Sequence, residues 1–250
     1  MKHSQNSAAM IEARGLCKTY GKTEAVRSLE LTVWEGEIFA LLGLNGAGKT
    51  TTIRMLTGLT NPTGGSASLC GFPIGSPEMR ALVGLSPQEN SAAPGLTVRE
   101  NLRMTAAIYG IGDAPARTEE LIRRMNLTEH ADKRAKHLSG GLLRRLSIGM
   151  SLVTEPKVLF LDEPTLGLDV LARRELWKLI RELRSSMTVV LTTHYMEEAE
   201  TLADRIAIMA EGRILVCGTL SELRQSTGSA PDADLESIFL KLAGGCADEE

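Results

Sequence analysis

The sequence predicts an α/β fold in which a parallel sheet carries helices on both faces. Short apolar runs typical of buried strands alternate with segments that repeat apolar residues at helical spacing. Strands are predicted at 37–42, 157–162 and 188–193. Helices are predicted from residue 50 onward, at 171–184 and at 195–203. Strands separated by helices pair in parallel, and ligands bind where the carboxyl ends of such strands meet.

The first third of the chain predicts further β structure. Residues 11–33 contain short β-type segments with a turn at 20–22. A loop signal at 60–65 precedes another short β segment at 66–70. Residues 1–9 are polar and small, and we expect them to be disordered.

The middle of the chain has a sequence pattern typical of helices. Thr97 is a candidate N-cap for a helix that ends near Tyr109, a second helix spans 116–125, and a third begins near Leu142. We interpret residues of about 90–150 as a helical subdomain inserted into the α/β pattern.

The end of the chain returns to strands and closes with a helix. Strands are predicted at 205–209 and 213–217. After a polar stretch, apolar residues at helical spacing predict a helix at 235–242, which packs one face on the domain. We therefore expect one domain over residues 10–243 and a flexible tail at 244–250.

Composition and charge are those of an ordinary globular protein. The chain is 43% hydrophobic and 24% charged, with a net charge of −3. It has no global basic field, so we predict no nucleic-acid partner. Its apolar runs are far shorter than the roughly 20 residues that span a bilayer. The four scattered cysteines resemble reduced thiols, so we expect a cytoplasmic chain.

A glycine-rich loop is the most informative segment of the sequence. Residues 43–51 read Gly-Leu-Asn-Gly-Ala-Gly-Lys-Thr-Thr, between a predicted strand and a predicted helix. Glycines let backbone N–H groups converge on phosphate oxygens, and the helix N-terminus adds partial positive charge. Lys49 would reach the terminal phosphates, and the Thr50 hydroxyl would bind Mg²⁺. The predicted nucleotide-binding residues of this loop are Gly43, Leu44, Asn45, Gly46, Ala47, Gly48, Lys49, Thr50 and Thr51.

Two carboxylates end the predicted strand at 157–162. Mg²⁺ prefers oxygen ligands, so we assign Asp162 to the metal, directly or through water. Glu163 would then lie next to the γ-phosphate, where it can act as general base for the attacking water. The alternative is that both acids only cap the turn at Pro164, which the upstream phosphate loop makes the weaker interpretation.

Two further polar residues are candidates for the same site. His194 ends the strand that follows the Asp162 strand in the sequence, so it can face the same phosphate. Gln88 follows a short apolar stretch and could place its amide near the metal and the water. Taken alone, a single histidine or a loop glutamine is more often structural than catalytic.

The order of four motifs indicates a family. The phosphate loop is followed by Leu-Ser-Gly-Gly at 138–141, then by Leu-Phe-Leu-Asp-Glu-Pro at 159–164 and by the strand-ending His194. In this order and spacing, the chain resembles the ATP-binding subunit of an ATP-binding-cassette (ABC) transporter across about residues 10–243. The resemblance implies a P-loop NTPase core with a RecA-like parallel sheet, an N-terminal antiparallel β subdomain and the helical subdomain.

The resemblance also implies roles for individual residues. Tyr20 matches the aromatic residue that stacks on adenine. Gln88 matches a glutamine that contacts both Mg²⁺ and the membrane partner, and thus a metal ligand and a catalytic residue. Residues 167–169 match a loop that links two active sites. The Ser139, Gly140 and Gly141 segment matches the one that contacts ATP bound to the opposite subunit.

A dimer follows from these implied roles. One chain carries one set of motifs, so it supplies two half-sites, and two subunits would close two ATP molecules between them. A monomer should bind ATP but hydrolyse it poorly. Leu142 departs from the glutamine usual in the family, which predicts weaker closure because about 0.5–1.5 kcal/mol of hydrogen bonding is lost. Leu166 also departs from the usual small or polar residue, and nothing in the sequence explains it.

The expected protein is an Mg²⁺-dependent ATPase that energises an exporter through a separate integral membrane permease. It would lie on the cytoplasmic face of the membrane, with a homodimer as the expected pairing. Residues 97–102, 192–200 and 235–243 look like those of bacterial drug-type exporters. Two alternatives stay open: a soluble ABC-type ATPase that acts on ribosomes or DNA, and a P-loop kinase for a small acceptor. Soluble ABC-type ATPases usually carry two cassettes in one chain. A kinase would give residues 138–141 and His194 no role.

Overall fold

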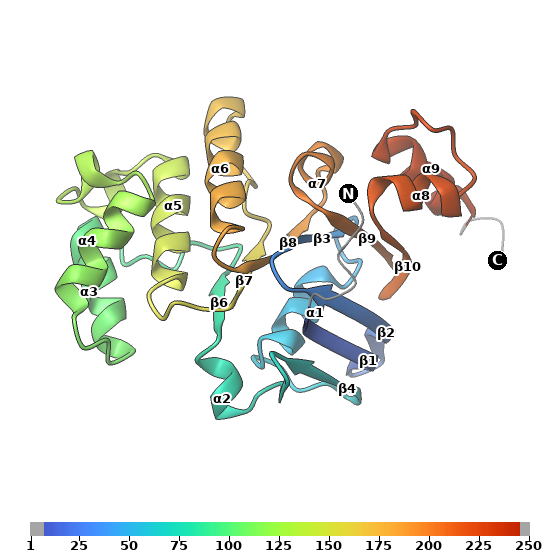
Figure 1. The fold of residues 1–250 in the computed structure, drawn as a ribbon, viewed down its shortest axis with the longest axis horizontal. Helices are drawn as coiled ribbons and strands as arrows, with labels where there is room; N and C mark the ends of the chain where they lie inside the picture. The colour runs from blue at the N-terminus through green and yellow to red at the C-terminus, as the bar shows by residue number, and fades with distance from the viewer. Residues whose placement is uncertain (1–7, 246–250) are drawn as a thin grey trace.

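A six-stranded sheet forms the centre of the protein, whose structure, a computed structural model, describes residues 8–245 (Figure 1). Its strand order is β10-β9-β3-β8-β7-β6. In that order the strands span Arg213–Gly218, Arg205–Ala210, Ile38–Leu42, Thr188–Thr193, Val158–Asp162 and Val83–Ser86. The pairs from β9 to β6 are all parallel, and β10 pairs antiparallel with β9. The sheet is thus mixed but mostly parallel.

A second, antiparallel sheet lies below the first in Figure 1. Its order is β2-β1-β4-β5, over Thr23–Trp34, Ala9–Tyr20, Gly64–Leu69 and Phe72–Pro73. The predicted short segments at 11–33 are in fact two long strands that pair with each other around the turn at Gly21. Bulges shift the register of the two strands and interrupt the alternation of apolar and polar residues. The sequence pattern therefore predicts several short strands in place of two long ones.

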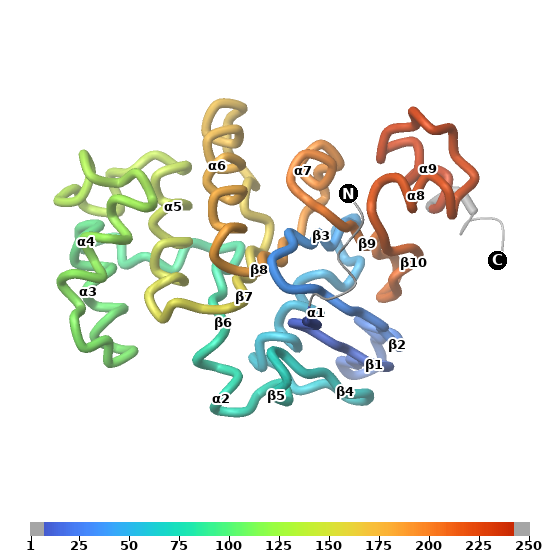
Figure 2. Tube along the Cα trace, viewed as in Figure 1, coloured from blue at the N-terminus to red at the C-terminus, as the bar shows by residue number. Residues whose placement is uncertain are grey.

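Helices lie on both faces of the central sheet and at both of its ends (Figure 2). The α-helices are α1 (Lys49–Leu56), α2 (Pro77–Arg80), α3 (Val98–Ile108), α4 (Ala114–Arg124), α5 (Gly140–Ser151), α6 (Val170–Leu183), α7 (Met196–Leu202), α8 (Leu220–Ser226) and α9 (Leu235–Gly245). Short 3₁₀ turns at Thr128–His130 and Ala135–His137 connect α4 to α5. Helices α3, α4 and α5 gather at the β6 end of the sheet, and α8 and α9 lie at the β10 end.

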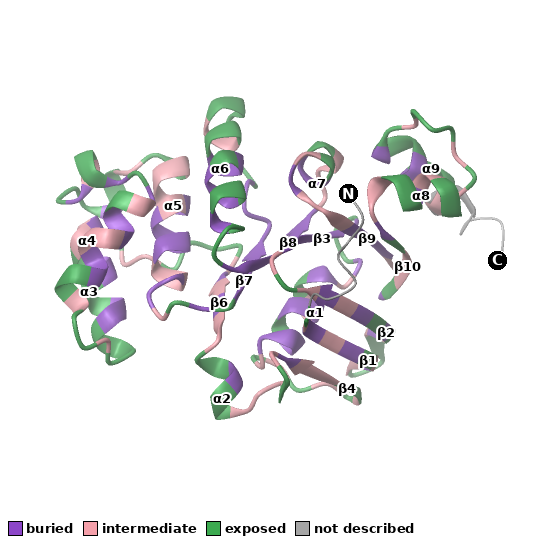
Figure 3. Ribbon diagram, in the orientation of Figure 1, coloured by how far each residue is buried: buried purple, intermediate pink, exposed green. Residues whose placement is uncertain are grey.

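Alternate residues of each central strand enter two separate cores, which is why the strands read as unbroken apolar runs. Ile38 and Leu42 pack with α6 and α7 in one core. Phe39 and Leu41 pack in the other with α1 and the antiparallel sheet. All five residues of β3 are buried, as the purple centre of Figure 3 shows. The prediction of helices on both faces is confirmed, because α6 and α7 cover one face and α1 covers the other together with the second sheet.

Several helices begin at capping side chains, including α2 and α8, which were not predicted. Thr97 caps α3 in a reciprocal capping box with Glu100. Thr219 and Glu222 form the same box at α8, so the signal for α8 was present in the sequence. Ala9 already belongs to β1, the Ala8 carbonyl oxygen accepts from the Glu35 N–H, and α9 reaches Gly245. The rest of the predicted disordered start and tail, residues 1–7 and 246–250, lies outside the described residues. No helix within 8–245 is both long and apolar enough to cross a membrane.

Candidate functional site

The loop from Gly43 to Gly48 joins β3 to α1 by a path that requires glycine at specific points. A Cβ on Gly43 would lie 2.3 Å from the Met209 carbonyl oxygen, and one on Gly48 would lie 2.5 Å from that of Ala25. Gly46 and Gly48 have φ values of 84° and 102°, which L side chains rarely adopt. Strands β9 and β2 therefore force the loop into shape, and α1 begins at its end without a side-chain cap.

The loop forms one wall of a cavity of about 450 Å³ at the carboxyl ends of the central strands. The cavity is lined by Ala25, Asn45, Gly46, Ala47, Gly48, Lys49, Thr50, Thr51, Gln88, Glu163, Leu166 and His194. Ten of these were predicted site residues, and they come from the loop, α1 and the segments after β6, β7 and β8. Parallel pairing brings those segments to one edge of the sheet.

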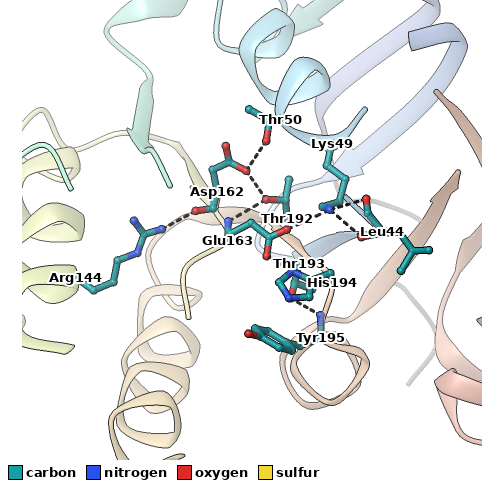
Figure 4. Close-up of polar contacts among 11 residues, drawn as sticks. Leu44, Lys49, Thr50, Arg144, Asp162, Glu163, Thr192, Thr193, His194 and Tyr195 are labelled. Atoms are coloured by element: carbon teal, nitrogen blue, oxygen red, sulfur yellow. Dashed lines mark hydrogen bonds and ion pairs between the residues drawn. The ribbon is translucent and has the colours of Figure 1, made fainter. Parts of the chain in front are cut away.

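Glu163 lies at the centre of the polar contacts in this cavity (Figure 4). Its Oε1 lies 3.1 Å from the Lys49 Nζ, and its Oε2 lies 2.9 Å from Nδ1 of His194. The Lys49 ammonium also donates to the carbonyl oxygens of Gly43 and Leu44, at 2.8 and 3.2 Å. Glu163 has a φ of 47°, an uncommon value for a residue with a side chain. The backbone after β7 is therefore turned so that the carboxylate meets Lys49 and His194.

Asp162 is held by two hydroxyl groups. Its Oδ1 accepts from Thr50 at 3.2 Å and from Thr192 at 2.6 Å, and it is only 5% exposed. The Thr192 hydroxyl also accepts a hydrogen bond from the Glu163 N–H at 3.0 Å. Thr192 thus fixes both acids from the neighbouring strand β8. Nothing in its local sequence separates it from the other buried residues of that strand, and only the pairing of Asp162 with Thr192 places it here.

Several predicted site residues lie away from the cavity. Tyr20 ends β1, is 48% exposed and is not among the lining residues; Lys18 lies over its ring. The Ser139–Gly141 segment begins α5, where the Ser139 hydroxyl accepts from the Leu142 N–H, and it too is outside the cavity. Gly43 and Leu44 support Lys49 through their carbonyls, and Leu44 is 58% exposed.

Two buried ionisable residues beside the site were not predicted. Arg144 of α5 is 4% exposed and contacts the backbone around Asp162, and burial lowers its pKa to about 10. Glu198 of α7 is fully buried and accepts from the Trp177 indole N–H at 3.0 Å. Burial raises the pKa of Glu198, and the hydrogen bond from Trp177 opposes that rise.

The geometry suits a triphosphate with a divalent metal: a cradle of N–H groups, one lysine, a hydroxyl beside a carboxylate, and a second carboxylate. Residues 26–166 match the profile of the family described as "ABC transporter". This chain belongs to the ABC transporter family. The predicted family and the predicted ABC-type ATPase domain are thereby confirmed.

The relatives of this ABC protein include bacterial and mammalian proteins. It is 45% identical to the daunorubicin/doxorubicin resistance ATP-binding protein DrrA of Streptomyces peucetius, over 88% of this chain and 68% of that one. It is 42% identical to the Nod factor export ATP-binding protein I of Cupriavidus pinatubonensis, over 87% and 69%. It is 44% identical to the human phospholipid-transporting ATPase ABCA3 over 82% of this chain, which spans only 12% of that much longer protein.

Solved structures show the same fold. An ATP-binding subunit of an ABC transporter matches with a TM-score of 0.83 and 30% identity, over 94% of this chain and 99% of that one. The ATP-binding cassette MJ0796, in a dimeric post-hydrolysis state bound to ADP and Pi, matches with a TM-score of 0.76 and 25% identity, over 84% and 99%. The predicted fold class is confirmed, with an antiparallel N-terminal sheet beside a mostly parallel core sheet.

Proposed function

We propose that this ABC protein is the ATP-hydrolysing subunit of an exporter whose membrane path is formed by a separate permease. Two bacterial relatives named above are ATP-binding proteins of drug resistance and of Nod factor export. The single observation that carries the proposal is the Lys49–Glu163–His194 constellation in a loop-lined cavity.

Hydrolysis needs a base, and Glu163 has the position for it. Lys49 is paired with Glu163 and with loop carbonyls, and a triphosphate would draw the ammonium toward its own oxygens. The freed carboxylate accepts a proton from water while the water oxygen bonds to the γ-phosphorus. The bond from the γ-phosphorus to the bridging oxygen breaks, which leaves ADP and phosphate. His194 holds the other carboxylate oxygen in place.

The donors around Asp162 fit Mg²⁺, which binds hard oxygen ligands and phosphate oxygens. The Thr50 hydroxyl and the Asp162 carboxylate already lie 3.2 Å apart, and Gln88 lines the same cavity. These three residues would hold the ion, which would neutralise charge that develops on the phosphate oxygens. Within the described residues, no group of three His, Cys, Asp or Glu could hold a metal alone.

A second subunit would complete each cavity. The Ser139–Gly141 segment carries N–H groups at the start of α5 yet lies outside the cavity of its own chain. The cassette MJ0796 is a dimer in its ADP and Pi state. We propose that two copies of this chain pair so that the Ser139–Gly141 segment of each covers the ATP of the other. Tyr20, exposed at the end of β1, would stack on adenine.

A groove beside the site is the proposed contact with the permease on the cytoplasmic face of the membrane. It has a volume of about 750 Å³ and lies between α1, β6, α3 and α5. Leu59 and Tyr109 are 62% and 61% exposed at its wall. Pro87 also lines it, next to Gln88 of the nucleotide cavity. A cytoplasmic segment of the permease seated here would therefore be linked to the nucleotide through two adjacent residues.

Phosphate release and co-purification test the proposal together. With ATP and Mg²⁺ and no acceptor, we expect inorganic phosphate from the wild type, and almost none from Lys49→Ala because its phosphate affinity is lost. We also expect an integral membrane protein to co-purify with the wild type and to be lost with Leu59→Glu. Phosphate transfer only to an added acceptor would identify a kinase, and a ribosomal or DNA partner would overturn the transport role.

A further inference from the structure

Arg144 is a buried cation whose three donor groups all face backbone carbonyls of the catalytic region. Its Nε donates to the Pro164 oxygen at 3.0 Å and its Nη2 to the Asp162 oxygen at 2.8 Å. Its Nη1 donates to the Pro87 oxygen. A planar guanidinium holds its donors in a rigid fork, so these three carbonyls are fixed relative to one another.

Each of these carbonyls adjoins a residue that the proposed function uses. Pro87 precedes Gln88, and Asp162 and Pro164 lie on either side of Glu163. The positive φ of Glu163 falls within the backbone that Arg144 clamps. Figure 4 shows Arg144 reaching the Asp162 backbone from the side opposite Thr192. The acids are thus fixed by Thr192 on one side and by Arg144 on the other.

The helix that carries Arg144 also carries the segment expected to cover the partner's ATP. Ser139 caps α5, and Arg144 follows about one turn later. The start of α5 is packed tightly, because a Cβ on Gly141 would lie 3.0 Å from that of Ala172 in α6. A displacement of this helix end would therefore be passed on to Arg144.

We propose that Arg144 is a positioning residue that sets Glu163 and Gln88 for hydrolysis when the start of α5 engages ATP on the partner copy. This inference rests on the proposed function. The guanidinium keeps its charge at neutral pH, because its pKa of about 10 is well above 7. Its hydrogen-bond partners are neutral carbonyls, and attraction from Asp162 and Glu198 favours its charged form. Its removal leaves the nucleotide contacts of the loop intact.

Arg117 provides a matched control. It is 7% exposed, and its guanidinium likewise donates to backbone carbonyls, those of Leu152 and Val153. These carbonyls lie at the end of α5 remote from the cavity. Arg117→Met and Arg144→Met both remove a buried guanidinium from backbone carbonyls. Arg117→Met also breaks ion pairs with Glu120 and Glu155, and only Arg144→Met touches the catalytic backbone.

Steady-state ATP hydrolysis by the full chain, with Tm measured alongside, tests the inference. For Arg144→Met we expect kcat to fall by about 10–100-fold, the range for displaced catalytic groups, with KM for ATP within about threefold. Arg117→Met should lower Tm comparably and leave kcat unchanged. Equal kcat for the two variants would overturn the inference. An inactive wild type would instead overturn the proposed function.

Two further variants keep the test decisive. Arg144→Lys keeps the charge without the fork, and a wild-type kcat for this variant would overturn the inference even if Arg144→Met fails to fold. If Arg144 acts through Glu163, adding Arg144→Met to Glu163→Gln should lower the residual rate by less than about threefold. A full additive loss would show that Arg144 acts independently of Glu163, contrary to the inference.

Discussion

Glu163 and His194 meet across the ends of two neighbouring parallel strands, with 2.9 Å between Oε2 and Nδ1. Strands β7 and β8 pair in register from Val158 to Asp162, so the residues just beyond them are brought side by side. The Glu163 carboxylate and the His194 imidazole, far apart in sequence, thereby form one hydrogen-bonded pair. The proposed mechanism depends on that pair.

Substitution of the Glu163 base should slow ATP hydrolysis but leave ATP binding intact. Glu163→Gln keeps the size of the side chain but cannot take the proton from water. We expect hydrolysis to slow by about 10²–10⁴-fold, the usual contribution of a general base. This corresponds to roughly 3–5 kcal/mol of barrier. Phosphate release and equilibrium ATP affinity should be measured on the same preparation, and an active Glu163→Gln enzyme would refute the assignment.

Loss of the His194 imidazole should slow hydrolysis less than loss of the Glu163 carboxylate. His194→Ala leaves the base in place but removes its partner, so we expect kcat to fall by about 10–100-fold through misplacement. ATP affinity should stay within a few fold. His130→Ala, in the 3₁₀ turn that follows α4, is the control and should behave as wild type. Equal rates for the two histidine variants would show that His194 is structural.

The Thr192 hydroxyl should matter for activity as well as stability. Thr192→Val removes the donor to Asp162 and the acceptor for the Glu163 N–H, at a cost of about 1–3 kcal/mol for buried groups left unpaired. We expect lower activity and a higher Mg²⁺ requirement. Thr188→Val on the same strand removes only an acceptor for the Gly36 N–H and should lower stability alone. A normal Mg²⁺ dependence in Thr192→Val would contradict this role.

Glu198 should make the protein less stable as pH rises. Burial raises its pKa from the ordinary 4.5, so the folded state holds this proton over a pH range where the unfolded state has released it. Stability is therefore lost between pH 4.5 and the raised pKa. Glu198→Gln has no proton to lose in this range. The free energy of unfolding of the variant in urea, minus that of the wild type, should therefore increase from pH 5 to pH 8. A difference independent of pH would contradict the raised pKa.

Local signals were sufficient for most of the fold. The strand at 158–162 and the helix after it follow from apolar periodicity, and Thr97 capped its helix as expected. The coverage of the second sheet face could not be read locally, because helix α1 and strands β1 and β2 meet it only in three dimensions. Helix α8 was missed although its capping box was readable.

Local signals were less complete for the site. Residues with unusual spacing, such as Lys49 and Glu163, were predicted, and the structure brings them within 3.1 Å. Thr192 and Arg144 were not predicted, because no local sequence pattern distinguishes them from other buried threonines or helical arginines. Their importance lies in which backbone groups the strand register and the helix packing bring to them.

We propose that each catalytic cavity is completed by a second copy of the chain. The most direct test is specific ATPase activity at saturating ATP and Mg²⁺, measured over a dilution series whose monomer content is known from sedimentation. We predict that activity per chain falls steeply as the dimer dissociates. Constant activity per chain under conditions where only monomers are present would contradict the account.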